Sequence, residues 1–371
     1  MRAWLEIDLD ILGENYHLVR NKIGAGVDIM AVVKSDAYGH GLDRIAKELD
    51  LLGVDSFAVI SLDEARRVRR HSAKPVLIMG YCDSKEIAEA IDEDFILSLY
   101  DRELIALYER IALRAGKLAR VQMKVETGLN RLGIEIDEAA DVLTGQHRFP
   151  HVSVEAIFSH LAKTSDRTTN LEQLRRLQQL LVKTQGRTNL LPIHFISSGS
   201  LENFPEGRFD AVRVGLALYG VDEALPGTKP TLTCKSIVMQ VKEVAIGEGV
   251  SYDHLFIAER PTTIAIVAIG YAEGYTQALT GRAEVLVKGK RVKVLGKICM
   301  NLITVDVTDL PVRRGDEVVL LGSQKDDSGQ ATTITASELA LWSNLRHHEI
   351  ITRFGTALPR VYLKGRHESR T

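Results

Sequence analysis

Residues 29–41 have the sequence Ile-Met-Ala-Val-Val-Lys-Ser-Asp-Ala-Tyr-Gly-His-Gly. The first five form a continuous apolar run without alternation, which is typical of a parallel strand covered on both faces. The run stops at Lys34, and an amphipathic helix is predicted from Leu42. In a barrel, Lys34 would lie at the carboxyl end of an inner strand, where barrel enzymes place their reactive groups. It is either a strand end that reaches solvent or a desolvated amine suited to carbonyl chemistry.

Apolar stretches of similar length recur along the next 180 residues and alternate with helical patterns. Such alternation predicts a (β/α)8 barrel. An open doubly wound sheet is the competing topology, although no dinucleotide glycine fingerprint follows the first strand. The predicted strands are 29–33, 56–60, 75–79, 95–99, 119–125, 154–158, 193–196 and 211–215.

A Pro- and Gly-containing stretch at 222–230 reads as a linker, and strand patterns dominate after it. We therefore predict two domains, a barrel over 10–225 and a mainly β domain over 226–371. A short strand within 1–9 is expected to pack with the β domain. One helix is expected there from Thr335, because Glu338 three residues later completes a capping box.

Composition limits the class of function. The chain has 371 residues and a net charge of −2, which argues against a nucleic-acid or anionic-membrane surface. Three scattered cysteines (Cys82, Cys234 and Cys299) indicate reduced thiols in a cytoplasmic protein, with neither a disulfide framework nor a metal-ligand pattern. No signal peptide or membrane span is expected.

Several other predicted strands also end in polar side chains. Arg131 lies on a Gly-bounded loop after the fifth strand. His160 and His194, at the sixth and seventh strands, have a structural explanation more often than a catalytic one. Ser198 follows the seventh strand, and Gly215 follows the eighth. Barrels commonly bind a phosphate at this place. Arg213 stands inside an apolar strand and needs a partner, because an unpaired buried charge is very costly.

These stretches resemble the motifs of one family. Val-Val-Lys-x-x-Ala-Tyr-Gly-His-Gly is similar to the cofactor-lysine motif of alanine racemases, which bind pyridoxal phosphate. Segments 124–133, 247–252, 269–274 and 296–301 resemble further motifs of that family, in the same order. The resemblance extends from Arg2 to about Tyr362.

The resemblance implies a role for each candidate residue. Lys34 and Tyr252 would be the two bases that act on opposite faces of the substrate, although Tyr252 alone would suggest only packing. Arg131 would bind the cofactor's phenolic oxygen and the substrate carboxylate, and Met300 would line the substrate entrance. The remaining cofactor contacts would be Tyr38, His160, Ser198, Arg213, Gly215 and His348, and the supporting residues Lys124 (often carbamylated in the family), His194, Tyr271 and Asn301.

The resemblance also implies reaction control and assembly. Arg213 would face the cofactor's ring nitrogen and keep it unprotonated, because two adjacent cations repel. A weaker electron sink favours racemisation over transamination or decarboxylation. The β domain of one subunit would cover the barrel mouth of another, so that Tyr252 acts beside a neighbour's Lys34 in a homodimer. The expected product is D-alanine for peptidoglycan.

Some positions depart from the family pattern. His348 replaces a tyrosine, Ser197 an asparagine, and Asn301, Glu273 and Glu126 replace aspartates. A serine or broad-specificity racemase is therefore the second hypothesis. Three further hypotheses remain. The first is a decarboxylase with the same two domains, which would need a carboxylate in place of Arg213. The others are a cofactor carrier, a class that resembles the barrel alone, and a catalytically degraded paralogue.

Overall fold

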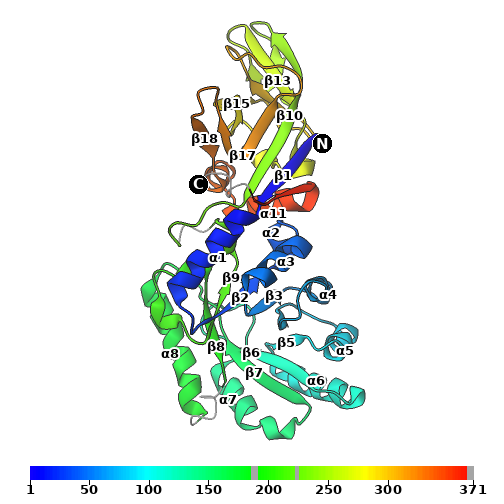
Figure 1. Cartoon of the computed structure of the whole chain (residues 1–371), viewed down its shortest axis with the longest axis vertical. Helices are drawn as coiled ribbons and strands as arrows, with labels where there is room; N and C mark the ends of the chain where they lie inside the picture. Colours follow the sequence, from blue (N-terminus) through cyan, green and yellow to red (C-terminus); the bar gives the residue numbers. More distant parts are fainter. Residues whose placement is uncertain (185–190, 222–224, 366–371) are drawn as a thin grey trace. The chain divides into compact units, whose positions relative to one another are not determined.

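Eight parallel strands pair in chain order, and the first pairs with the last, so that the sheet closes into a barrel. This confirms the predicted fold and excludes the open doubly wound sheet. The computed structural model describes residues 1–184, 191–221 and 225–365 (Figure 1). The barrel strands are β2 (Asp28–Val32), β3 (Ser56–Val59), β4 (Val76–Ile78), β5 (Ile96–Leu99), β6 (Ala119–Lys124), β7 (Val152–Phe158), β8 (Ile193–Ser197) and β9 (Ala211–Val214).

One helix precedes the first barrel strand, others follow the strands, and together they cover the outside of the barrel (Figure 1). They bury one apolar face each, and several begin at a side-chain cap such as Asp83 or Asp101. Because both faces of β2 are covered, Ile29 to Val33 are all buried, as the unbroken apolar run predicted. These helices are α1 (Leu9–Ile23), α3 (Leu42–Leu52), α4 (Leu62–Arg69), α5 (Ser84–Asp92), α6 (Arg102–Ala115), α7 (Ile136–Thr144), α8 (Arg167–Lys183) and α9 (Leu216–Tyr219).

The remaining long strands form a nine-stranded sheet in the order β18-β17-β14-β15-β16-β13-β10-β1-β19, with an additional pairing of β17 and β10. The N-terminal strand β1 lies between β10, to which it is antiparallel, and β19, to which it is parallel. Their bounds are β1 (Ala3–Asp8), β10 (Leu232–Val244), β13 (Thr262–Val267), β14 (Glu284–Val287), β15 (Lys290–Leu295), β16 (Ile303–Asp306), β17 (Glu317–Lys325), β18 (Ala331–Ile334) and β19 (Arg360–Leu363).

Two helices accompany this sheet where the sequence predicted one. Thr335 caps α10 (Ala336–Ser343), and its side chain accepts a hydrogen bond from the N–H of Glu338, as the capping box predicted. The second helix, α11 (His347–Ala357), was missed because its N-cap residue, Arg346, makes no side-chain cap. No helix of the described residues is long and apolar enough to cross a membrane.

Contacts divide the chain into two compact units. The β unit comprises Met1–Leu12, Tyr38–Gly41 and the chain from Lys229, and the barrel unit comprises Gly13–Ala37 and Leu42–Thr228. The predicted bounds differ from these by three residues at each junction and do not separate Tyr38–Gly41 from the barrel. Residues 222–224 of the predicted linker lie outside the described residues.

The two glycines of the 29–41 stretch are required by close contacts inside the β unit. Gly39 has φ +84°, and a Cβ there would lie 2.8 Å from the carbonyl oxygen of Ile351 and 2.9 Å from the Cα of Gly355. A Cβ on Gly41 would lie 2.0 Å from the hydroxyl of Tyr362. That hydroxyl donates to the carbonyl of His40 between the two glycines, at 3.0 Å. This segment is therefore packed tightly, and is more than a flexible end to the strand.

The turn that follows Lys34 is left-handed. Ser35, Asp36, Ala37 and Tyr38 have φ between 53° and 55°, although none of them is glycine. This conformation costs about 1–2 kcal/mol for each L-residue, so surrounding contacts must hold it in place. The sequence did not predict it, because the two following glycines seemed to supply the necessary backbone freedom.

The contacts of Gly39 lead to a first prediction. Gly39→Ala should lower the free energy of unfolding by about 2–4 kcal/mol, because a left-handed alanine and the overpacking of Ile351 and Gly355 both destabilise the fold. Gly24→Ala is a matched control, since Gly24 has φ +83° but no other atom within 4 Å of the place that a Cβ would take. It should lose only about 1 kcal/mol. Both free energies are measured by denaturant unfolding at one protein concentration. Equal losses in Gly39→Ala and Gly24→Ala would contradict the proposed effect of packing at Gly39.

Candidate active site

Lys34 follows β2 at the carboxyl end of the barrel and is half-buried. Burial lowers the pKa of its amine, and the charges of Arg131 and Arg213 lower it further, while the carboxylate of Glu64 acts in the opposite direction. An amine that loses its proton more readily is a better nucleophile towards an aldehyde. Position and charge therefore favour carbonyl chemistry over a solvent-exposed strand end.

Arg213, on β9, is the buried charge at the centre of the barrel mouth. Its guanidinium donates to the carbonyl oxygens of His194, at 2.7 Å, and Phe195, at 3.1 Å, and also to that of Ser159. It contacts the ring nitrogens Nδ1 of His194, at 2.6 Å, and Nδ1 of His160, at 3.3 Å. All the acceptors among the described residues are neutral. Burial lowers the pKa of Arg213, but a guanidinium stays charged near neutral pH.

The two histidines are fixed as neutral acceptors by this arginine. Because Arg213 donates to Nδ1 of His194, the proton of His194 lies on Nε2, which donates to the side-chain oxygen of Gln122 at 2.9 Å. Burial, and then the charge of Arg213, hold the pKa of His194 well below its usual value. The same causes, together with Arg131, Lys124 and Lys34, lower the pKa of His160 to about 3. Both rings orient Arg213.

Lys124 and Arg131 come from the end of β6 and the loop after it. Burial, followed by the charges of Arg131 and Arg213, lowers the pKa of Lys124 to about 8. Arg131 is exposed. Its loop is tied to Glu126, because burial would raise the pKa of that carboxyl but hydrogen bonds from the backbone N–H groups of Asn130, Gly128, Arg131 and Leu129 lower it. The carboxylate thus fixes the loop from which the Arg131 guanidinium projects.

Ser198 and Gly215 lie together, as their positions after β8 and β9 predicted. The buried hydroxyl oxygen of Ser198 accepts hydrogen bonds from the N–H groups of Gly215 and Ala217, both at 3.1 Å. Its own proton is therefore available to a further acceptor. Hydroxyl and backbone donors at this end of a barrel suit a phosphate.

Three segments that follow different strands of the β unit converge on one face. The N–H groups of Tyr271 and Ala272 donate to the carbonyls of Cys299 and Met300 at 3.1 and 2.9 Å. Ser251, beside Tyr252, donates to the carbonyl of Lys297 at 2.7 Å. The side chains of Tyr252, Met300 and Tyr271 are 67%, 56% and 40% exposed. The β unit therefore presents three large side chains to its surroundings.

Tyr38 and His348 also belong to the β unit. Burial raises the pKa of Tyr38 to about 12, so its hydroxyl remains a proton donor near neutral pH. His348 is exposed in the first turn of α11, and its ring meets that of His347 edge-on at 5.4 Å. The candidate residues thus fall into two groups. The barrel unit holds Lys34, Lys124, Arg131, His160, His194, Ser198, Arg213 and Gly215, and the β unit holds Tyr38, Tyr252, Tyr271, Met300, Asn301 and His348.

Comparison with known proteins identifies the family. The model of the alanine racemase N-terminal domain matches residues 7–223, and that of the alanine racemase C-terminal domain matches residues 231–362. The chain belongs to the alanine racemase family. It is therefore an isomerase of the pyridoxal-phosphate-dependent type.

Individual relatives resemble the chain over almost its whole length. Alanine racemase 2 of Caldanaerobacter subterraneus is 33% identical over 97% of this chain and 94% of its own. The structure of the alanine racemase from Streptomyces lavendulae is 30% identical, with a TM-score of 0.90, and covers 100% of this chain and 99% of its own. That from Bartonella henselae, with covalently bound pyridoxal phosphate, is 27% identical, with a TM-score of 0.87, and covers 98% and 100%.

The side chains of the barrel unit fit this cofactor chemically. Lys34 offers a primary amine of lowered pKa to an aldehyde. The Arg213 guanidinium is a cationic donor whose acceptors are neutral throughout the described residues, which suits a neutral ring nitrogen. The Ser198 hydroxyl, whose oxygen accepts from the N–H groups of Gly215 and Ala217, has a proton to donate and suits a phosphate. These residues could therefore hold pyridoxal phosphate.

Two departures from the alanine racemase pattern contact each other. The side-chain amide of Asn301 donates to Oε1 of Glu273 at 2.7 Å, and Arg2 pairs with the same oxygen at 2.8 Å. Oε2 of Glu273 accepts from the N–H of Gly270 at 3.0 Å. With aspartate at position 301, as in the family pattern, two carboxylates would meet. Asn301 is thus suited to the longer acid at position 273, and the pair fixes the segment beside Met300.

Two important side chains were not singled out from the sequence. Gln122 lies within a strand and carries no motif. Glu64 follows Ser61 at capping-box spacing, and the Ser61 hydroxyl indeed accepts from the N–H of Glu64 at 3.3 Å. The Glu64 carboxylate, however, accepts from the N–H groups of Ile60 and Asp36. Only the fold could reveal that second contact.

The Asn301–Glu273 pair can be tested by exchange. Asn301→Asp should lower the free energy of unfolding by about 1–3 kcal/mol, because a partly buried hydrogen bond becomes a contact between two acids. Adding Glu273→Gln to this variant should recover most of the lost free energy of unfolding. The new amide at position 273 can donate to the carboxylate at position 301, while its oxygen still accepts from the N–H of Gly270. Additive losses in this double-mutant cycle, measured by denaturant unfolding, would show that the two positions are independent.

Proposed function

We propose that this protein interconverts L- and D-alanine with pyridoxal phosphate held by Lys34, through a two-base reaction that supplies D-alanine for peptidoglycan. The observation that supports this most strongly is the set of charges at the barrel mouth. An amine of lowered pKa, Lys34, lies under the influence of Arg131 and Arg213, and Arg213 is surrounded by neutral acceptors.

The proton transfers are assigned to two side chains. When bound, pyridoxal phosphate supplies an electron sink for the electron pair left at Cα when its proton is removed. Lys34 removes or returns that proton on one face of Cα, and Tyr252 does so on the other. The exposure of Tyr252 leaves its hydroxyl accessible.

The other side chains bind and orient. The planar Arg131 guanidinium pairs with the substrate carboxylate through two hydrogen bonds. Arg213, held by His160 and His194, donates to the ring nitrogen and keeps it unprotonated, which favours racemisation. Ser198 and the backbone at Gly215 bind the phosphate.

The remaining assigned residues act at the edges of the site. Tyr38 and His348 add donors for the phosphate. Lys124 supports Arg131, and its pKa of about 8 leaves part of its amine unprotonated and open to carbamylation. Met300 borders the substrate entrance, and Tyr271 and Asn301 support it.

We propose a homodimer in which Tyr252 of one copy acts beside Lys34 of the other, in the cytoplasm. The apolar side chains around Tyr252 support the covering of this face, because Leu255 and Met300 are also largely exposed. A second copy of the chain would bury them.

A serine or broad-specificity racemase remains the second candidate. The observation that favours it is the imidazole of His348, exposed at the start of α11. The family motif has a tyrosine, with its larger phenol, at this position. A decarboxylase is disfavoured by Arg213, and a carrier protein by the presence of the β unit.

The two bases can be separated by hydrogen exchange. In Tyr252→Phe, kcat/KM should fall about 10²–10⁴-fold and equally in both directions, because enantiomers are equally stable. In deuterated water, the variant should still exchange the α-hydrogen of one enantiomer, the one whose hydrogen faces Lys34. Mass spectrometry after chiral separation measures the deuterium content of each enantiomer. The enantiomer whose α-hydrogen faces Lys34 is the internal control, because it should still exchange. Exchange of both enantiomers at the wild-type rate would contradict the assignment of Tyr252.

Substrate preference is tested with L-alanine and L-serine side by side. We expect alanine to be preferred, and His348→Tyr to increase that preference, because the larger phenol narrows the space beside the substrate. The ratio of the two kcat/KM values, from chiral separation of the products, is the measurement. Serine turnover equal to or above that of alanine would replace the first hypothesis with the second.

A further inference from the structure

The left-handed turn after Lys34 is held by side chains that have no part in the reaction proposed above. Ser35, Asp36 and Ala37 have φ/ψ near 54°/50°, a conformation that L-residues adopt only under constraint. The direction in which Lys34 leaves the backbone is coupled to this turn, because the turn begins at the next residue. Whatever holds the turn therefore helps to place the amine.

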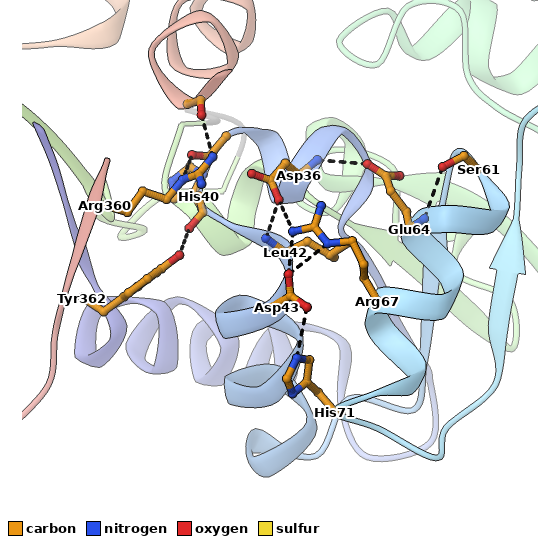
Figure 2. A network of polar contacts seen from close by, with 12 residues as sticks. Asp36, His40, Leu42, Asp43, Ser61, Glu64, Arg67, His71, Arg360 and Tyr362 are labelled. Carbon is orange, nitrogen blue, oxygen red and sulfur yellow. Dashed lines mark hydrogen bonds and ion pairs between the residues drawn. The ribbon is translucent and has the colours of Figure 1, made fainter. Parts of the chain in front are cut away.

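Glu64 makes the most direct of these contacts. It lies in the first turn of α4 and is 8% exposed. Its Oε1 accepts from the N–H of Asp36 at 3.0 Å, and its Oε2 accepts from the N–H of Ile60 at 3.1 Å. One carboxylate thus joins the turn after β2 to the chain after β3. Figure 2 shows its hydrogen bond to Asp36. Without it, two backbone donors would lose their acceptor.

A second clamp holds the side chain of Asp36. Its Oδ1 accepts from the N–H of Leu42 at 2.9 Å and from Arg67 at 2.7 Å. Arg67 also pairs with Asp43 at 2.6 Å, and His71 contacts the other oxygen of Asp43 at 3.2 Å (Figure 2). Asp36, within the turn, and Asp43, on α3, are thus both joined to Arg67 on α4 by ion pairs.

Glu64 also differs in charge from the other groups that act on the Lys34 amine. Among the described residues of the barrel unit, the charges that act on the Lys34 amine are those of Arg131 on the loop after β6, Arg213 on β9 and Glu64 on α4. The charge of Lys34 in turn lowers the pKa of Lys124, at the end of β6, and of His160, after β7. The arginines lower the pKa of Lys34, and Glu64 raises it. Glu64 thus acts on Lys34 through both the backbone and its charge.

We propose that Glu64 is a positioning residue for Lys34, which fixes the left-handed turn so that the amine points to the cofactor aldehyde, while Asp36 and Arg67 form a second clamp on the same turn. This rests on the proposed role of Lys34 as the residue that holds the cofactor. Glu64 itself touches neither substrate nor cofactor in this arrangement.

The test compares three variants of the full-length chain. Glu64→Gln removes the charge and one of the two acceptors. Glu64→Asp keeps the charge but is too short to reach both N–H groups. Asp63→Asn is the matched control, because Asp63 is an exposed acid in the same first turn of α4. Thermal unfolding is recorded for each variant, so that a loss of folding is seen separately.

Two readouts other than turnover follow Lys34 directly. The first is the rate at which the cofactor-free chain captures pyridoxal phosphate. The amine displaces the aldehyde oxygen as water, borohydride then reduces the new bond, and peptide mass spectrometry locates it. The second is the pH dependence of Lys34 acylation in the cofactor-free chain, which reports the pKa of its amine.

Both Glu64 variants should capture the cofactor about tenfold more slowly or worse, because a misplaced amine rarely meets the aldehyde. In Glu64→Gln alone, acylation of Lys34 should begin at lower pH, because the opposing negative charge is gone. Asp63→Asn should match the wild type in both readouts. If Glu64→Gln does not fold, the slower capture and unchanged acylation of Glu64→Asp carry the test.

Two results separate the failure of this inference from that of the proposed function. If the wild type captures pyridoxal phosphate on Lys34 but the Glu64 variants do so at the same rate, the positioning role is wrong. An unchanged pH dependence in a folded Glu64→Gln would overturn the electrostatic role. If the wild type itself does not capture pyridoxal phosphate on Lys34, the proposed function is wrong, whatever the Glu64 variants do.

Discussion

The chemistry of the barrel mouth depends on one buried guanidinium, Arg213, whose partners in the described part of the chain are all uncharged. A charge in a protein interior is tolerated only when its hydrogen-bonding groups are satisfied. Arg213 meets this condition with three carbonyl oxygens and two imidazole nitrogens, supplied by Ser159 and His160 after β7 and by His194 and Phe195 within β8. Because no carboxylate neutralises it among the described residues, its charge lowers the pKa of Lys34, Lys124 and both histidines.

The position of the reactive amine depends on a second constraint, which lies in the backbone. Four left-handed residues after Lys34 cost several kcal/mol at about 1–2 kcal/mol each. Charge-assisted hydrogen bonds, worth about 1.5–3 kcal/mol each, are strong enough to offset this. Glu64, on α4, accepts such a bond from the N–H of Asp36, and the Asp36 carboxylate accepts from Leu42, at the start of α3, and from Arg67, on α4. The turn is thus stable only in the context of the whole barrel, which suits a residue that must be held in one direction.

The sequence predicted what is encoded locally. The apolar runs predicted the eight barrel strands within a few residues. Their polar ends indicated Lys34 and Ser198, and the charge inside the last strand indicated Arg213. It could not predict the left-handed turn, because no residue preference signals positive φ at serine or alanine. Nor could it pair Glu273 with Asn301, since residues 28 apart in the chain meet only through the folded sheet. The second C-terminal helix was missed for want of a capping signal.

The central claim is that Arg213, held by neutral acceptors, keeps the cofactor's ring nitrogen unprotonated and so directs the chemistry towards racemisation. The most direct measurement is the nitrogen-15 NMR shift of ring-labelled pyridoxal phosphate bound to the wild-type protein near neutral pH. We predict the shift of an unprotonated pyridine that accepts a hydrogen bond. The shift of a pyridinium would contradict this claim, because a second cation could not then lie beside the guanidinium without a counter-charge.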